Sequence, residues 1–191
     1  MKNPYTVPSM KLSALPSDRM PSCVTKAGSL LSPVVLLLGL AMGCSAAGAD
    51  VLDGRVVGVT DGDTLTVIDA AKTEYKIRVA GIDAPEKAMP WGQKSKQALS
   101  DRVYGRDARV DWSKRDRYGR IVGKVIVDGK DAGLALVGEG LAWHYKKYEN
   151  EQPLADRLEY ARLENEARSM RRGLWSDPAP VPPWEWRKQK Q

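Results

Sequence analysis

The chain has 191 residues, with 30 Lys and Arg, 24 Asp and Glu, and a formal net charge of +6. This balance is compatible with a polyanionic partner but does not by itself identify one. The chain has one His and two Cys, and no Cys follows Cys44. The chain therefore has too few His and Cys residues to favour a His-rich zinc site, a Ser-His-Asp triad or thiolate catalysis. We expect any general base to be a carboxylate or a metal-bound hydroxide, and His144 to be an ordinary surface or strand residue.

The N-terminal part predicts a signal peptide over residues 1–49. Residues 30–42 (LLSPVVLLLGLAM) form an apolar run that is too short for a comfortable membrane span and precedes a run of small residues. Cleavage is expected after Ala49, and Met20 is a better start because it leaves an n-region of ordinary length. The mature protein would be secreted or periplasmic. A lipoprotein anchored at Cys44 is the alternative.

Strand patterns come next in the chain. Apolar and polar residues alternate, or β-branched residues cluster, in five short segments bounded by turn residues. A turn at residues 61–62 joins the first two strands, and residues 83–85 (DAP) end the third, because proline cannot continue a ladder. The five predicted strands are residues 55–59, 64–68, 75–80, 108–112 and 121–127.

Three helices are predicted, at residues 91–104, 132–139 and 153–172. Each ends before a glycine, and Asp131 is a suitable N-cap for the second. The apolar face of the third is expected to hold Tyr160, Leu163, Ala167, Met170 and Leu174. The elements predict an α+β, mainly β domain over residues 50–176, a five-stranded Greek-key barrel of the OB type with three helices. Residues 177–191 read as an extended, Pro-rich tail that clamps onto the barrel.

Acidic and guanidinium side chains gather in residues 61–120. A carboxylate cluster can hold a hard divalent cation, and a pair of arginines can hold a phosphate by forked hydrogen bonds. Each short motif alone is weak, since acidic turns with glycine are common. Together they supply what cleavage of a phosphodiester needs. The residues are Asp61, Asp63, Arg78, Asp83, Glu86 and Arg120.

Three ordered segments resemble the signature segments of the staphylococcal nuclease (thermonuclease) family. They are residues 59–64 (VTDGDT), 77–86 (IRVAGIDAPE) and 116–120 (DRYGR). Residues 140–143 (GLAW) and 173–175 (GLW) match later segments of that family. The resemblance covers roughly residues 54–176, and three motifs in order with correct spacing are specific.

The resemblance implies a role for each matching residue. Asp63, Asp83 and the backbone carbonyl of Ala84 match the calcium ligands, and Asp61 matches an acid that orients the site. Glu86 matches the proposed general base, although it could instead only position the water. Arg78 and Arg120 match the two guanidiniums on the phosphate.

Three aromatic residues fall where the family contacts nucleic acid: Tyr118, Trp143 and Tyr145. For Trp143 and Tyr145, packing within the fold is an equally good interpretation, and Tyr118 could be only a turn residue. Trp143 departs from the best-known member, which has tyrosine there, and Ala84 replaces a threonine. The loop at residues 87–90 is also shorter than in that member, and we expect this difference beside Glu86 to alter the reach to substrate or the catalytic rate.

The resemblance therefore implies a calcium-dependent, sugar-nonspecific endonuclease. It would hydrolyse DNA and RNA to 3′-phosphate and 5′-hydroxyl ends, and would act as a monomer without a stable protein partner. The alternative is a nucleic-acid-binding OB barrel with weak or no activity, which would use a basic groove and aromatic platforms.

Overall fold

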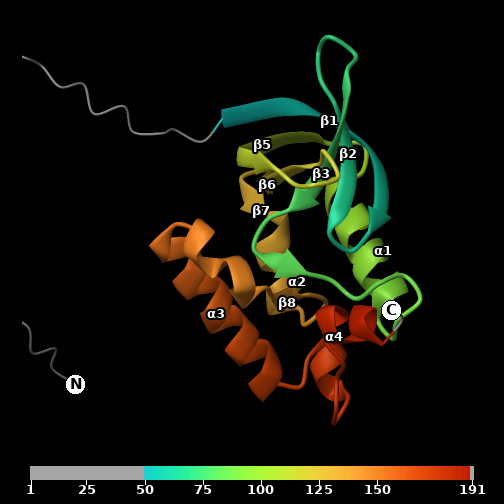
Figure 1. Ribbon diagram of the computed structural model, residues 1–191, viewed down its shortest axis with the longest axis vertical. Coiled ribbons are helices and arrows are strands. Elements are labelled where there is room, and N and C mark those ends of the chain that lie inside the picture. Colours follow the sequence, from blue (N-terminus) through green and yellow to red (C-terminus); the bar gives the residue numbers. More distant parts are fainter. Residues whose placement is uncertain (1–49, 190–191) are drawn as a thin grey trace, which may run out of the picture. The chain divides into compact units, whose positions relative to one another are not determined.

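The computed structural model describes residues 50–189 (Figure 1). The predicted signal peptide at 1–49, including Met20, Cys44 and the cleavage position after Ala49, lies outside the described residues. In the described part, no helix is both long enough and apolar enough to cross a membrane.

Five strands form a closed barrel. Neighbouring strands are antiparallel in the order β3-β2-β1-β5-β6, and a parallel pairing of β3 with β6 closes the sheet. This arrangement confirms the five-stranded barrel of the OB type that the strand patterns predicted. The barrel strands are β1 (Asp50–Asp61), β2 (Thr64–Ile68), β3 (Glu74–Val79), β5 (Asp107–Arg115) and β6 (Ile121–Val127).

Two of the three remaining strands form a small separate sheet. The strand β4 (Ile82–Asp83) pairs antiparallel with β8 (Trp143–His144), so that Asp83 lies opposite Trp143. The third, β7 (Lys130–Asp131), extends the edge of β6. The first strand is longer than predicted because its first residues, from Asp50 onward, pair with β5.

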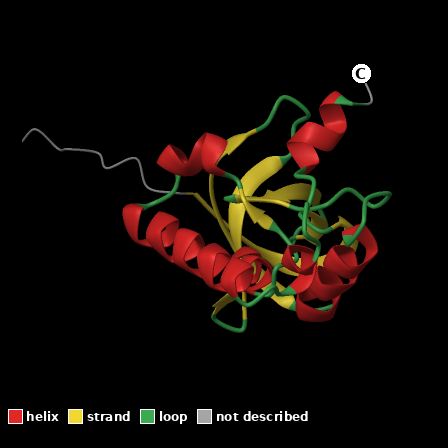
Figure 2. Cartoon of the chain, turned by 90° about the horizontal axis from the view of Figure 1, so that it is seen from below, coloured by secondary structure: helices red, strands yellow, loops and turns green. Residues whose placement is uncertain are grey.

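Helices cover the outside of the barrel (Figure 2). The three predicted helices are present, and Asp131 caps the second by accepting hydrogen bonds from the backbone N–H groups of Gly133 and Leu134. A fourth short helix lies in the Pro-rich tail, which we expected to be extended. The α-helices are α1 (Gly92–Val103), α2 (Ala132–Gly138), α3 (Leu154–Ser169) and α4 (Pro183–Lys188), and the 3-10 helices are η1 (Lys146–Glu151) and η2 (Gly173–Ser176).

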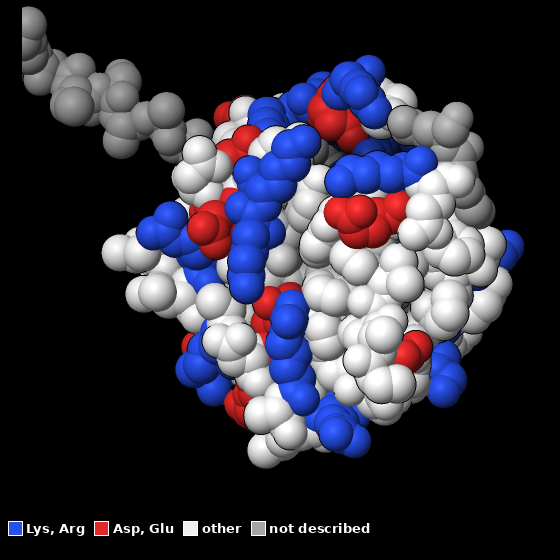
Figure 3. Space-filling view, turned by 60° about the horizontal axis from the view of Figure 1, so that its bottom comes forward, with Lys and Arg blue, Asp and Glu red and all other residues white. Residues whose placement is uncertain are grey.

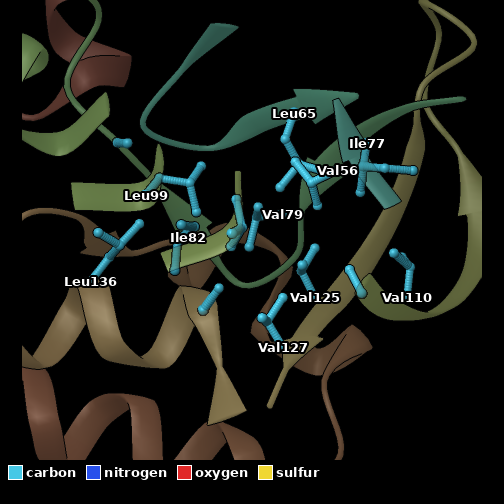
Figure 4. Close-up of a cluster of buried hydrophobic side chains, with 14 of the residues drawn as sticks. Val56, Leu65, Ile77, Val79, Ile82, Leu99, Val110, Val125, Val127 and Leu136 are labelled. Atoms are coloured by element: carbon cyan, nitrogen blue, oxygen red, sulfur yellow. The ribbon is translucent and has the colours of Figure 1, made fainter. Parts of the chain in front are cut away.

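The main core fills the barrel and the space under α1 and α2 (Figure 4). Every second residue of β6 is buried, which is the pattern of a strand with one face on a core. A second, smaller cluster is formed by Trp143, Ala167, Leu174 and Trp175, with Trp91 and Trp184 against it. Because Trp184 belongs to α4, the tail packs on this cluster.

The apolar face predicted for the last long helix is wrong at one position. Met170 is 59% exposed, whereas Glu164 is 1% exposed. The carboxylate of Glu164 accepts a hydrogen bond from the backbone N–H of His144 at 3.1 Å and pairs with Lys146 at 3.2 Å, which compensates its burial. His144 is a strand residue as expected, but it is buried and not on the surface.

Candidate active site

A close approach at Gly62 brings the two acidic motifs together. A Cβ atom at this position would lie 2.0 Å from Oγ of Ser95 and 2.7 Å from Cβ of Ala84. The turn between β1 and β2 can therefore pack against α1 and the segment after β4 only because Gly62 has no side chain. As a result, Oδ2 of Asp63 accepts a hydrogen bond of 2.9 Å from the backbone N–H of Ala84.

Arg78 lies between the two buried aspartates. It comes from β3, opposite Thr64 of β2. Its Nη1 lies 2.6 Å from Oδ2 of Asp63, and its Nη2 lies 2.9 Å from Oδ1 of Asp83. The forked geometry suits a guanidinium better than an ammonium. Asp63 and Asp83, called the acidic pair below, are thus joined through one partly buried cation.

Burial strongly affects the acidic pair. It raises the pKa of Asp63 to about 6, against the opposing effect of Arg78 and with a further increase from neighbouring Asp61. Burial also raises the pKa of Asp83, although hydrogen bonds from Arg187 and the charge of Arg78 oppose it. In both aspartates burial thus outweighs the opposing effect of the neighbouring arginines on the pKa, and a further cation close by would favour the ionised carboxylates.

The chemistry of these donors fits a hard divalent cation. Between residues 50 and 189, no group of three or more His, Cys, Asp or Glu side chains is arranged to hold a metal ion. Calcium and magnesium, however, are commonly held by one or two carboxylates with backbone carbonyls and water. The acidic pair provides carboxylate oxygens of this kind, and the backbone N–H of Ala84, which donates to Asp63, brings the main chain of Ala84 next to them.

Arg120 is held in position by hydrogen bonds with Asp116 and Thr64. Oδ2 of Asp116 accepts a hydrogen bond from Nε of Arg120 at 2.7 Å, and its Oδ1 accepts from the backbone N–H groups of Tyr118 and Arg120. Burial acts to raise the pKa of Asp116, but these hydrogen bonds lower it overall. Nη1 of Arg120 also donates to Oγ1 of Thr64 at 3.3 Å, and this hydroxyl donates to Oδ1 of Asp63 at 3.1 Å. Thr64 therefore connects Arg120 to Asp63, which in turn pairs with Arg78.

Glu86 is placed at the edge of the site, where its side chain is 41% exposed. Its Oε1 accepts a hydrogen bond of 2.9 Å from Nη1 of Arg187, a residue of α4. The same guanidinium donates from Nη2 to Oδ2 of Asp83 at 2.5 Å. The C-terminal tail therefore contributes a third arginine to the site.

One groove of about 1110 Å³ is lined by all the site residues expected from the sequence except Trp143. Tyr118 is 68% exposed beside Arg120, so its ring is accessible from the groove. Tyr145 is half-buried, and its ring stacks on that of Trp184 at 5.4 Å between centroids. Trp143 is 8% exposed and meets Trp175 edge-on at 4.3 Å, which supports the packing interpretation for this residue.

Basic side chains outside the acidic pair also border this groove. Lys and Arg form rows on the face seen in Figure 3, with Asp and Glu between them. The groove wall contributes Arg109, Lys114, Arg115, Arg117, Lys124 and Lys147. Such side chains can contact the phosphate backbone of a nucleic acid that lies in the groove.

Sequence reasoning did not single out Thr64, Asp116 or Arg187. The first two lie inside motifs that it used, residues 59–64 and 116–120, so their spacing next to Asp63 and Arg120 was a usable signal. Arg187 is 101 positions from Glu86. Nothing in the local pattern of the Pro-rich tail indicates that it reaches the site.

Comparisons with known proteins identify the family of the chain. Residues 76–177 match the family model described as staphylococcal nuclease homologue. An "Uncharacterized endonuclease" of Escherichia coli is 44% identical over 140 residues, which are 73% of this chain and 87% of that protein. An "Uncharacterized endonuclease" of Haemophilus influenzae is 36% identical over 162 residues, covering 85% of this chain and 86% of the relative.

A plant relative matches over a shorter part of its length. The "Staphylococcal-like nuclease CAN1" of Arabidopsis thaliana is 42% identical over 118 residues, which are 62% of this chain and 35% of that protein.

Proposed function

Because the chain belongs to the staphylococcal nuclease family, we propose that it is a calcium-dependent endonuclease that hydrolyses both DNA and RNA. The observation that supports this proposal most is the single groove. It is lined by the acidic pair, by Glu86 and by Arg78 and Arg120. This combination suits an anionic substrate whose reaction develops further negative charge.

The two arginines bind the scissile phosphate. Arg78 and Arg120 approach Asp63 from two directions, one directly and one through Thr64, so their guanidiniums are held in place before substrate arrives. Preorganised donors of this kind stabilise charge on the phosphoryl oxygens without reorganising during the reaction. Their forks also favour phosphate over single-point anions.

Glu86 accepts the proton of the attacking water. The water oxygen forms a bond to phosphorus while the bond from phosphorus to O5′ breaks, and O5′ takes a proton from solvent. The products are a 3′-phosphate and a 5′-hydroxyl. Glu86 suits this role because its carboxylate is partly exposed at the groove, where water has access, whereas the acidic pair is buried.

Asp63, Asp83 and the backbone carbonyl of Ala84 would hold the calcium ion, and Asp61 would orient Asp63. Oδ1 of Asp61 accepts a hydrogen bond from the backbone N–H of Asp63 at 3.2 Å, which supports this orienting role. When bound, the ion supplies Lewis-acid stabilisation of the phosphoryl oxygens. The raised pKa of Asp63, caused mainly by burial, is relieved when a cation is close.

Substrate affinity would come mainly from the phosphate backbone. Basic side chains line the groove together with the acidic pair, and Tyr118 and Tyr145 offer rings to bases. We therefore propose slight sequence preference and strong salt dependence.

We also propose that the protein acts as a monomer and is exported, with a mature chain starting at Asp50. Sequencing of the mature N-terminus checks the latter, and an acylated Cys44 would contradict it.

Digestion of circular single-stranded DNA and of RNA tests the proposal. Circular DNA has no ends, so its cleavage requires an endonuclease. We expect cleavage with calcium, none with excess EGTA, and products whose 3′ ends become extendable by polymerase only after phosphatase treatment. Cleavage that persists in EGTA would contradict the metal assignment. Binding of both nucleic acids without cleavage in calcium would instead favour the inactive OB barrel.

A further inference from the structure

The C-terminal helix α4 carries a guanidinium into the groove. Nη2 of Arg187 donates to Oδ2 of Asp83 at 2.5 Å, and Nη1 donates to Oε1 of Glu86 at 2.9 Å. Nη1 also lies 3.4 Å from Oδ1 of Asp83. The fork of one arginine therefore spans two acids to which the proposed function gives different tasks, metal binding and proton transfer.

These contacts use the oxygens that the reaction needs. Oδ1 of Asp83 already faces Arg78 at 2.9 Å, so Arg187 takes the second oxygen of the same carboxylate. An oxygen that accepts a hydrogen bond from a guanidinium is less available to a divalent cation, and two positive charges on one carboxylate repel each other. Glu86 is similarly less available as a base while it accepts from Arg187.

The same helix covers an aromatic side chain of the groove. The ring of Trp184 stacks on Tyr145, with centroids 5.4 Å apart and planes at 27°, and meets Trp143 edge-on at 5.5 Å. Helix α4 lies beside β8 in Figure 1. One face of Tyr145, which the family resemblance gives to nucleic acid, is thereby turned toward the tail.

Main-chain hydrogen bonds of α4 lie within the tail, and side chains attach it to the rest of the fold. The backbone N–H groups of Glu185, Trp186 and Gln189 donate to carbonyls of Pro182 and Glu185 within the tail itself. The side chain of Arg187 is 42% exposed, so water reaches its end of the ion pair, whereas the side chain of Asp83 is 1% exposed. The helix can therefore leave the groove without breaking the sheet, by giving up the ion pairs of Arg187 and the packing of Trp184.

We propose that α4 is an intrachain competitor for the active site, with Arg187 on Asp83 and Glu86 in place of the divalent cation. This inference rests on the proposed function, since it takes Asp83 as a calcium ligand. Binding of the cation and docking of α4 then oppose each other. By linkage, the factor by which α4 weakens calcium binding equals the factor by which calcium weakens docking of α4.

Calcium titration calorimetry without nucleic acid tests this competition on the full chain. Arg187→Ala should bind calcium about 3- to 30-fold more tightly than the natural protein, because it removes a partly exposed, charge-assisted contact. The matched control is Lys188→Ala, the next residue of the same helix, whose ammonium pairs with Glu185 inside α4 at 3.0 Å. Its calcium affinity should equal that of the natural protein.

Hydrogen exchange gives a readout that does not depend on that variant. In the natural protein, calcium should speed the exchange of the amides of residues 184–189. Exchange in β2 and β3 should stay constant or slow. The size of the effect should shrink in Arg187→Ala, since α4 has then already lost its hold on Asp83 and Glu86.

The possible outcomes separate this inference from the proposed function. Equal or weaker calcium binding by Arg187→Ala would overturn the competition while leaving the nuclease assignment intact. Loss of DNA affinity in Arg187→Ala with unchanged calcium affinity would make Arg187 a phosphate-binding residue and would also overturn it. Absence of calcium binding in every variant would overturn the metal assignment and this inference together.

Discussion

The backbone N–H of Ala84 donates a hydrogen bond of 2.9 Å to Oδ2 of Asp63, which is 21 positions earlier in the chain. This bond joins the turn after β1 to the segment after β4. It puts a backbone amide on a carboxylate whose burial raises its pKa to about 6. The two acidic motifs of the sequence thus become one site through a contact of the main chain.

Gly62→Ala should weaken this junction. The added Cβ would meet Ser95 and Ala84 at distances far below van der Waals contact, so the turn must shift. We expect a loss of about 1–3 kcal/mol in the free energy of unfolding, as for other overpacked sites, measured by urea denaturation. The control is Gly58→Ala, where the nearest atoms are those of Thr66 at 3.7 Å. Equal losses in the two variants would show that the junction at Gly62 is not tightly packed.

Asp63→Asn should stabilise the calcium-free protein at neutral pH. The pKa of Asp63 is about 6 in the fold and 3.8 as its reference value, so the folded state holds the proton more tightly. Its contribution to stability is therefore full below pH 4 and is lost as the pH rises to 6. At pH 7.5 the variant, which carries no buried charge, should gain up to about 3 kcal/mol.

Urea denaturation in EDTA at pH 7.5 and pH 3.5 measures this difference. The gain should vanish at the lower pH, because Asp63 is then protonated in both states. Asp101→Asn, at an exposed position of α1, serves as the control and should have little effect at either pH. A gain in stability at pH 3.5 without a gain at pH 7.5 would reverse the expected pH dependence and would contradict the raised pKa of Asp63.

The barrel was predictable because its strands obey a simple period. Alternation over residues 121–127 shows directly as alternate burial in β6, burial in β2 alternates from Leu65 onward, and glycines mark the ends of helices. The pairing of β4 with β8 was not predictable, since two-residue strands have no period. Glu164 was also missed, because a carboxylate on a helix is usually solvated and its buried partner His144 lies 20 positions away.

The candidate site was predictable to the extent that its residues lie in ordered motifs. The sequence spacing of Arg78 and Asp83, on a strand and at its end, already places them near each other. Contacts that depend on the closed barrel could not be predicted from the sequence. Arg120 reaches Thr64 across 56 positions, and Arg187 reaches Asp83 across 104. The packing of Trp143 likewise depends on a second core that the tail helps to complete.

Thr64→Val should uncouple Arg120 from Asp63. The hydroxyl of Thr64 is the link between them, and valine keeps its shape without the two hydrogen bonds. We expect a loss of about 1–3 kcal/mol in stability, because Thr64 and Asp63 are buried. The value of kcat/KM should fall by about tenfold through misplacement of Arg120. Thr64→Ser should restore both quantities, whereas a serine variant as impaired as the valine variant would exclude the hydroxyl as the link.

Glu86→Gln should slow the chemical step without weakening substrate binding. Glutamine keeps the size of the side chain but cannot accept the proton of the water, so single-turnover cleavage should slow by about 10²–10⁴-fold. The affinity for DNA in calcium should change little. The control is Glu74→Gln at an exposed position of β3 outside the groove. A slower rate that is fully recovered at high DNA concentration would assign Glu86 to binding and not to proton transfer.

The account depends most on Arg78 and Arg120 acting on the same phosphodiester. Single-turnover cleavage of a short DNA by Arg78→Lys and Arg120→Lys tests this directly, since both variants keep the charge but lose the fork. The control is Arg106→Lys, whose guanidinium pairs with Asp128 outside the groove. We predict that each site variant, folded as judged by circular dichroism, is slower by at least about 100-fold. Rates near that of the natural protein in both variants would contradict the proposed active site.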